Sequence, residues 1–406
     1  MSKFNSNRIK THFLRITVVF SVAFLSLFVF SACGETAIAQ NGLQKTEPII
    51  LTYSQGSALP SISASSAILI EAGTKTVIGE KNADARLPMA STTKIMSALV
   101  AIENADISKT VAVSSQAIGV EGSSIYLYDG EKLSLEDLIY AMMLESANDA
   151  AAAIAIEVGG SIEGFAKMMN KKAEELGLKN TSFQNPHGLD NDLHYTTAHD
   201  LAIIAVAAME NPTFQKIVST YKKTIPLNET EGVRLLINHN KLLKGYDGAV
   251  GIKTGYTKKS GRCLVSAAEK DGVKLICVTL NAPDDWRDHA KMLDYGFSLF
   301  ESRLLCSDGE FSYTLPIVGG DKEYITVKNQ GELRVILKRG SPNTEFRVCL
   351  PRFAFASIKE GDEVGRLVYY SGGKEIGSVP LTASFGSDRI IYKKNLFEKL
   401  LSLFSK

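Results

Sequence analysis

The chain has 406 residues, of which 45% are hydrophobic, 22% charged and 8% aromatic. This composition is that of an ordinary globular protein and excludes collagen, a pure coiled coil and a wholly disordered chain. Forty-five Lys and Arg residues against 44 Asp and Glu leave a formal charge of +1, so no nucleic-acid partner is expected. The length predicts two or three domains at about 150 residues each. Five cysteines are too few for a disulfide scaffold.

Residues 1–39 have the pattern of an export signal. Four basic residues precede the uncharged apolar run Ile16–Phe30, and Ala37-Ile38-Ala39 forms an A-x-A cleavage site. Two alternatives stay open: an uncleaved membrane anchor over Ile16–Ala32, which is about 17 residues long, and lipidation at Cys33. All three place the following residues outside the cytoplasm. The basic residues are Lys3, Arg8, Lys10 and Arg15.

The next elements predict a domain that mixes helices and strands. After a polar leader over Gln40–Ser57, a hairpin is expected from Ser66 to Gly79 around Gly73-Thr74. Strands at both ends of a helical middle predict an α/β domain over residues 40–305. Helices are expected over Ser91–Ile102, Ser134–Leu144, Asn148–Val158, Ser161–Leu176, Thr197–Met209 and Asp288–Phe300. Strands are expected over Leu235–Ile237, Gly251–Thr257, Arg262–Glu269 and Val273–Leu280.

The register of the last predicted hairpin indicates whether Cys263 and Cys277 can form a disulfide. Asp271-Gly272 is a two-residue turn signal that places Cys277 opposite Ser266. Cys263 then falls on the opposite face of the sheet, so a bridge between Cys263 and Cys277 is not expected. Both are predicted to be buried thiols. A Cys306–Cys349 disulfide stays open.

Short alternating runs predict a small β domain over residues 310–390, after a change of composition near Ser302–Gly309. Residues 391–406 then have an amphipathic helical pattern at about 100° per residue, with lysines on the polar half. This pattern predicts a helix in the plane of an anionic membrane surface. The alternative is a helix docked on the protein itself. The runs are Phe311–Leu315, Glu323–Val327, Leu333–Leu337, Phe346–Leu350, Glu363–Tyr370 and Lys374–Val379.

Three short motifs carry the chemistry: Ser91-Thr92-Thr93-Lys94, Ser146-Ala147-Asn148 and Lys253-Thr254-Gly255. Each is weak alone, because Ser-x-x-Lys also occurs at Ser219/Lys222 and Ser371/Lys374. The ordered set is the strong signal, since only the first Ser-x-x-Lys begins a predicted helix and precedes the other two motifs.

The spacing indicates a serine nucleophile with a lysine base. Ser91 and Lys94 are three residues apart on a predicted helix, so their side chains share one face. A lysine serves as base if burial and a neighbouring cation lower its pKa. Lys253 is expected to be that cation, and Ser146 is expected to relay a proton. The N–H of Ser91 and an N–H of the strand around Gly255 are expected to form an oxyanion hole.

These motifs and their contexts resemble the D-alanyl-D-alanine carboxypeptidases of low molecular mass among the penicillin-binding proteins. The contexts are Leu87–Met96, Glu145–Ala150 and Gly251–Thr257. The resemblance covers residues 60–305 and extends to the small β domain and the terminal helix. It implies the penicillin-recognising serine hydrolase fold, in which helices flank an antiparallel sheet. It also implies a location on the outer face of the bacterial cytoplasmic membrane.

The resemblance implies the following catalytic roles. Ser91 attacks the carbonyl between two D-alanines at the end of a peptidoglycan stem peptide, and Lys94 acts as the base. Ser146 and Asn148 shuttle protons and hold the substrate amide. Penicillins mimic the D-Ala-D-Ala end, so β-lactams are expected to acylate Ser91. Neither a cofactor nor a metal ion is expected.

The remaining expected site residues bind substrate. Lys253 and Thr254 are expected to hold the terminal carboxylate, with Arg287 as the candidate for an additional arginine there. The alternative for Arg287 is an ordinary solvated charge. Gly255 leaves room for a substrate backbone to pair with its strand. Tyr256 stands where some family members have histidine.

Two departures from related enzymes favour the carboxypeptidase branch over class A β-lactamases. The middle motif is Ser-Ala-Asn instead of Ser-Asp-Asn, and no Glu-x-x-Leu-Asn lies between Ser146 and Lys253.

Other functions are less well supported by the motifs. The chain has no G-x-S-x-G for a Ser-His-Asp hydrolase and no H-E-x-x-H for a zinc peptidase. A non-catalytic wall-binding protein would lack Ser91 or Lys94. A D,D-endopeptidase uses the same residues and stays open. Asn185–Asp200 is interpreted as a loop that forms a wall of the site and Gly119–Tyr128 as a loop near the cleft, with ordered surface loops as the alternative for both.

Overall fold

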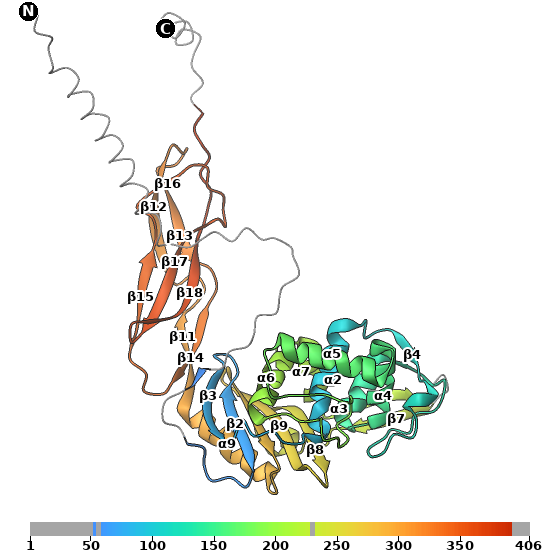
Figure 1. Cartoon of the computed structure of the whole chain (residues 1–406). Coiled ribbons are helices and arrows are strands. Elements are labelled where there is room, and N and C mark those ends of the chain that lie inside the picture. The colour runs from blue at the N-terminus through green and yellow to red at the C-terminus, as the bar shows by residue number, and fades with distance from the viewer. Residues whose placement is uncertain (1–51, 54–57, 228–231, 392–406) are drawn as a thin grey trace, which may run out of the picture. The chain divides into compact units, whose positions relative to one another are not determined.

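The computed structural model describes residues 52–53, 58–227 and 232–391 (Figure 1). The predicted export signal, most of the polar leader and the predicted terminal helix from residue 392 onward lie outside these ranges. Within them, no helix is long and apolar enough to cross a membrane.

A six-stranded sheet with the order β1-β3-β2-β10-β9-β8 is the centre of the first domain. Every pairing is antiparallel except that between β1 and β3. β8 is thus the outer strand of this sheet among the described residues. β1 falls inside the predicted leader, so part of that leader is a strand. The strands are β1 Thr52–Tyr53, β2 Ser66–Glu71, β3 Thr76–Lys81, β8 Ala249–Thr257, β9 Gly261–Lys270 and β10 Val273–Leu280.

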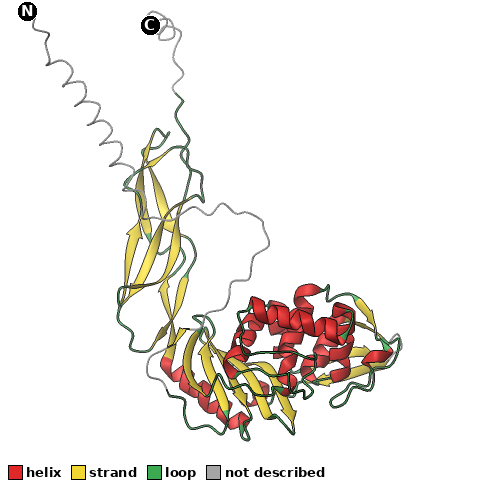
Figure 2. Ribbon diagram, in the orientation of Figure 1, coloured by secondary structure: helices red, strands yellow, loops and turns green. Residues whose placement is uncertain are grey.

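Helices cover both faces of this sheet (Figure 2). β2 is buried along its length, and its alternate residues enter two different cores. Ile68 and Ile70 pack in the core with the helices that follow β3, whereas Leu69 packs with Met292 and Leu293 of α9. The α/β expectation is therefore confirmed. The helices are η1 Ala90–Thr93, α2 Lys94–Asn104, α3 Leu135–Leu144, α4 Asn148–Gly159, α5 Ile162–Glu175, α6 Ala198–Met209, α7 Pro212–Ser219, α8 Leu242–Gly245 and α9 Asp285–Leu299.

Capping residues begin three of these helices where the sequence predicts. The side chains of Ser134, Ser161 and Thr197 each accept a hydrogen bond from the backbone N–H three residues later. Two boundaries differ from the prediction. The segment around Ser91 is a 3₁₀ turn, and the α-helix begins only at Lys94. Helix α9 begins at Asp285 instead of Asp288.

The smaller elements of the first domain complete its helical side. A short 3₁₀ turn, η2 Ser115–Ala117, lies between the paired strands β4 Thr110–Ala112 and β5 Lys132–Ser134. A hairpin of β6 Lys222–Leu227 and β7 Gly232–Ile237 follows α7. The sequence predicts only the end of β7 from this hairpin.

The predicted β9–β10 hairpin is confirmed in its register. Lys270 pairs with Val273 across Asp271-Gly272, and Cys277 pairs with Ser266. Cys263 and Cys277 are buried free thiols, as expected.

The predicted small β domain is present and has its own apolar core. Six of its strands form a sheet with the order β15-β17-β18-β13-β12-β16, and β11 pairs with β14. Cys306 and Cys349 are free, so the disulfide left open by the sequence is not formed. The strands are β11 Phe300–Cys306, β12 Ser312–Val318, β13 Tyr324–Asn329, β14 Leu333–Lys338, β15 Thr344–Cys349, β16 Ala354–Phe355, β17 Glu363–Ser371 and β18 Lys374–Ala383.

Candidate active site

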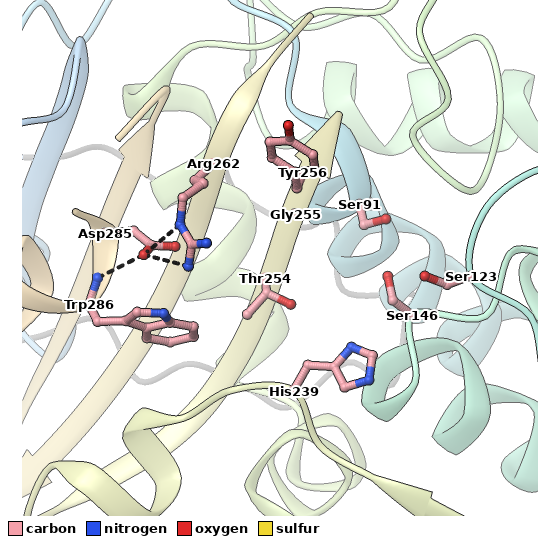
Figure 3. Close-up of a pocket in the computed structure, with 10 residues that line it drawn as sticks. All are labelled: Ser91, Ser123, Ser146, His239, Thr254, Gly255, Tyr256, Arg262, Asp285 and Trp286. Atoms are coloured by element: carbon pink, nitrogen blue, oxygen red, sulfur yellow. Dashed lines mark hydrogen bonds and ion pairs between the residues drawn. The ribbon is translucent and has the colours of Figure 1, made fainter. Parts of the chain in front are cut away.

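A cavity of about 330 Å³ opens beside the outer strand β8 (Figure 3). It brings together side chains from all three sequence motifs with others from β9 and the start of α9. The turn around Ser91 and the loop before α4 face β8 across it. The lining residues are Ser91, Ser123, Ser146, His239, Thr254, Gly255, Tyr256, Arg262, Asp285 and Trp286.

Ser91 and Lys94 are in direct contact, as their spacing predicts. Lys94 Nζ lies 2.9 Å from Ser91 Oγ. The same nitrogen lies 2.7 Å from Asn148 Oδ1 and 2.6 Å from the backbone oxygen of His187. The pair forms although Ser91 belongs to the 3₁₀ turn and Lys94 to the following α-helix, because the two side chains still share one face.

Lys94 is suited to act as a base. Its side chain is fully buried, and burial lowers its pKa well below the ordinary value. The charge of Lys253 lowers the pKa further, whereas Asp149 opposes the shift. A neutral amine has two hydrogens, and the oxygens of Asn148 and His187 can only accept. These two acceptors therefore use both hydrogens and leave the nitrogen lone pair for the hydroxyl proton of Ser91.

Lys253 is the second buried ammonium of the site. Burial lowers its pKa to about 7, against the opposing charge of Glu145. Its Nζ donates to the backbone oxygen of Thr254 at 3.0 Å. Ser146 lines the cavity from the other side, with a φ of +60° that is uncommon for a residue with a side chain. Such a backbone cost is typical of positions where a side chain is held for function.

Asn148 connects Lys94 to the loop of residues 119–128. Its Nδ2 donates to the backbone oxygen of Glu121, and its backbone N–H donates to the oxygen of Ser123. The next residue, Asp149, is buried and accepts from Ser124 Oγ and from the backbone N–H groups of residues 125 and 127. Two adjacent residues at the start of α4 therefore hold this loop against the cavity, and Ser123 of the loop lines it.

The loop of residues 185–200 packs against the turn that carries Ser91 and Lys94, and none of its residues lines the cavity. Gly188 has a φ of +90°, and a Cβ there would lie 1.9 Å from the backbone oxygen of Ala90. Only glycine permits this close approach. His194 Nδ1 accepts from the backbone N–H of Gln184, and its Nε2 lies 2.8 Å from Thr93 Oγ1. Burial and the charge of Lys94 lower the pKa of His194 to about 4, so this histidine is a neutral structural residue at pH 7.

Strand β8 and the nucleophile turn have adjacent backbones. A Cβ on Gly255 would lie 3.0 Å from the backbone nitrogen of Ser91 and 3.1 Å from that of Thr92. The N–H groups expected to form the oxyanion hole therefore lie on two neighbouring segments. Thr254 lines the cavity, and Tyr256, with 66% of its surface exposed, lies at its mouth.

The structure does not bring Arg287 into the cavity. Its side chain is 70% exposed and pairs with Asp284 at 3.2 Å. The arginine that lines the cavity is Arg262, which the sequence reasoning does not identify. Its position follows from the β8–β9 register, which places it opposite Tyr256. A prediction of the turn between these strands would have found it.

Comparisons with known proteins agree with this architecture. Residues 53–284 match the D-alanyl-D-alanine carboxypeptidase family, and residues 300–385 match the C-terminal domain of penicillin-binding protein 5. The chain is 35% identical over 330 residues to D-alanyl-D-alanine carboxypeptidase DacF of Bacillus subtilis, which covers 79% of this chain and 85% of the relative. It is 31% identical over 352 residues to DacC of Escherichia coli, covering 82% and 86%.

Solved structures show the same fold. Penicillin binding protein 5 from Haemophilus influenzae aligns with a TM-score of 0.60 and 27% identity, covering 82% of this chain and 100% of that one. The Streptomyces K15 DD-transpeptidase aligns with a TM-score of 0.57 and 34% identity, covering 60% and 100%. With a family match over more than half of its length and the contact between Ser91 and the buried Lys94 in place, the chain belongs to the D-alanyl-D-alanine carboxypeptidase family of serine hydrolases.

Proposed function

We propose that the chain releases the terminal D-alanine from peptidoglycan stem peptides through an acyl-enzyme on Ser91, and thereby acts in cell wall biogenesis. The observation that carries this proposal is the arrangement at Lys94. A buried amine with a lowered pKa contacts the serine hydroxyl, and both of its hydrogens have other acceptors. This arrangement supplies a general base to a nucleophile.

The reaction follows from this geometry in two stages. Ser91 Oγ attacks the carbonyl carbon between the two D-alanines while Lys94 takes the hydroxyl proton. Backbone N–H groups of Ser91 and of β8 stabilise the oxyanion. The proton passes to the leaving amine, with Ser146 as relay, and the C–N bond breaks. Water then attacks the ester carbonyl while Lys94 takes one of its protons. The C–O bond to Ser91 breaks, Lys94 returns the proton to Ser91 Oγ, and the shortened peptide leaves as a free acid.

The proposed substrate contacts use the outer edge of β8. The peptide backbone lies along this strand beside Gly255, and Tyr256 lies at the mouth of the cavity. Asn148 holds the substrate amide, and Lys253 with the Thr254 hydroxyl binds the terminal carboxylate. Arg287 is left out of these contacts, because it lies outside the cavity lining and pairs with Asp284.

The location of the enzyme is also a proposal. Residues 1–39 direct export, and the amphipathic segment 391–406 lies on the outer surface of the cytoplasmic membrane, where peptidoglycan is accessible. β-Lactams would then reach Ser91 and acylate it. A D,D-endopeptidase, which would cut crosslinks with the same residues, is the alternative function.

The experiment is D-alanine release from a pentapeptide ending in D-Ala-D-Ala, measured with and without penicillin. We expect release that penicillin blocks. Ser91→Ala should abolish both release and covalent penicillin labelling while keeping the thermal unfolding midpoint. Labelling without release from the pentapeptide, but with cleavage of a crosslinked dimer, would favour the endopeptidase. Release by Ser91→Ala would show that the nucleophile is wrongly assigned.

A further inference from the structure

The cavity contains a guanidinium that none of the expected roles uses. Arg262 is the only Lys or Arg among the ten described lining residues. It lies beside Thr254 and opposite the turn that carries Ser91 (Figure 3). Its backbone is fixed, since it is paired with Tyr256 in the sheet and its oxygen accepts from the N–H of Ala282.

Two neighbours from the start of α9 hold the Arg262 side chain. Its Nε and one Nη each lie 2.9 Å from the same oxygen of Asp285. Asp285 is itself buried, and that oxygen also accepts from the backbone N–H of Trp286 at 2.9 Å. The guanidinium lies 5.9 Å from the centre of the Trp286 ring. Asp285 contacts only one edge of the Arg262 guanidinium, so the remaining N–H groups face the cavity. The Arg262 side chain is 42% exposed.

The charge balance of the cavity shows what this guanidinium contributes. Lys253 titrates near pH 7 and Lys94 well below its ordinary range, so neither is a permanent cation. His239 lines the cavity but lies 3.2 Å from Glu145 Oε2. An arginine stays charged at every physiological pH and matches a carboxylate with two parallel donors. Arg262 therefore supplies the lasting positive charge next to Thr254.

We propose that Arg262 binds the terminal carboxylate of the substrate, the role that the family resemblance assigned to Arg287, and that Asp285 positions it. The proposal rests on the proposed carboxypeptidase function. It makes Arg262 a determinant of specificity for a free carboxyl terminus. Arg287 instead pairs with Asp284 on the surface and serves as the matched control, being an arginine ion-paired near the same helix start.

The test compares two peptides that end in D-Ala-D-Ala, one with a free carboxylate and one with a carboxamide. Wild-type kcat/KM is expected to favour the free acid by about 10- to 100-fold, the range of one charge-assisted hydrogen-bond pair. Arg262→Ala should remove most of this preference by lowering kcat/KM for the acid and leaving that for the amide within about threefold. Arg262→Lys should keep part of the preference, and Arg287→Ala all of it.

A second variant separates attraction from repulsion. Arg262→Ala uncovers the carboxylate of Asp285, which could itself repel the substrate, so Arg262→Ala is also combined with Asp285→Asn. We expect no recovery of activity on the acid. Recovery would overturn the proposal, as would equal losses on both peptides, an unchanged preference in Arg262→Ala, or a preference lost in Arg287→Ala. If Arg262→Ala does not fold, Arg262→Gln, which keeps the length of the side chain, replaces it.

Failure of this proposal is distinguishable from failure of the proposed function. A wild-type enzyme that releases no D-alanine would refute the carboxypeptidase function. The role of Arg262 in binding a carboxylate would then be tested with β-lactams instead of peptides. Acylation rates of benzylpenicillin and its methyl ester then give the same comparison. A wild-type preference for the free acid penicillin that survives Arg262→Ala would overturn the role of Arg262.

Discussion

Gly122→Ala is predicted to slow acylation of Ser91 although residue 122 contacts neither Ser91 nor Lys94. A Cβ at this position would lie 2.8 Å from Asn148 Nδ2, about 0.7 Å inside ordinary van der Waals contact. Asn148 would have to move, and its Oδ1 now accepts from Lys94 Nζ at 2.7 Å. The amine would then lose one of the acceptors that direct its lone pair toward Ser91.

The magnitude follows from that lost hydrogen bond. A buried donor without a partner costs about 1–3 kcal/mol, and each 1.4 kcal/mol corresponds to about tenfold in rate. We therefore expect acylation to fall by about 10- to 100-fold. Alanine in a left-handed conformation adds roughly 1–2 kcal/mol of strain to the folded state. That strain lowers stability but does not by itself change the chemistry at Ser91.

Gly119→Ala is the matched control. Gly119 lies in the same loop with a φ of +71°, and no heavy atom lies within 4 Å of its Cβ position. Alanine at position 119 would have a similar backbone strain but would not displace Asn148. The assay is the second-order rate of labelling by a fluorescent penicillin, with thermal unfolding measured for both variants. Equal labelling rates in the two variants would refute the role given to Asn148.

Two further predictions concern pH and the membrane. Lys253 loses its charge as pH rises through about 7, so kcat/KM for a free acid substrate should fall on the alkaline side of pH 7. Lys253→Arg should move this fall to higher pH, because a guanidinium does not titrate there; an identical profile would contradict the role of Lys253. Deleting Tyr392–Lys406 from a chain that lacks residues 1–39 should release the protein from membranes without lowering activity on a soluble peptide. Unchanged membrane fractionation would contradict the predicted anchor.

Local patterns account for most of what the sequence predicts correctly. The Ser91–Lys94 contact depends on three residues of spacing, and the β9–β10 register depends on the Asp271-Gly272 turn. Caps such as Ser134 act within one helical turn. Each of these depends on atoms that are close in the chain. These local features are therefore nearly independent of the tertiary structure and can be predicted from the sequence.

The parts that the sequence does not predict depend on distant contacts. Arg262 is next to Asp285 and Trp286 only because β10 runs antiparallel to β9 and brings the start of α9 beside the start of β9. The placement of Arg287 outside the cavity depends on its position in the first turn of α9.

Helix α7 is missed for a different reason. Its signals are local, since Asn211 caps it and Pro212 follows, but the helix is only eight residues long and its apolar pattern is correspondingly short.

The proposed pairing of the substrate with the outer edge of β8 has a consequence for the range of substrates. Hydrogen bonds between backbones do not depend on which side chains the bound peptide carries. An enzyme that pairs its substrate with a strand edge is therefore insensitive to most of the stem peptide and sensitive to its last two residues. Bacteria whose stem peptides differ at internal positions could share such an enzyme unchanged. A chemical change at the peptide terminus, in contrast, would prevent such an enzyme from binding and cleaving the peptide.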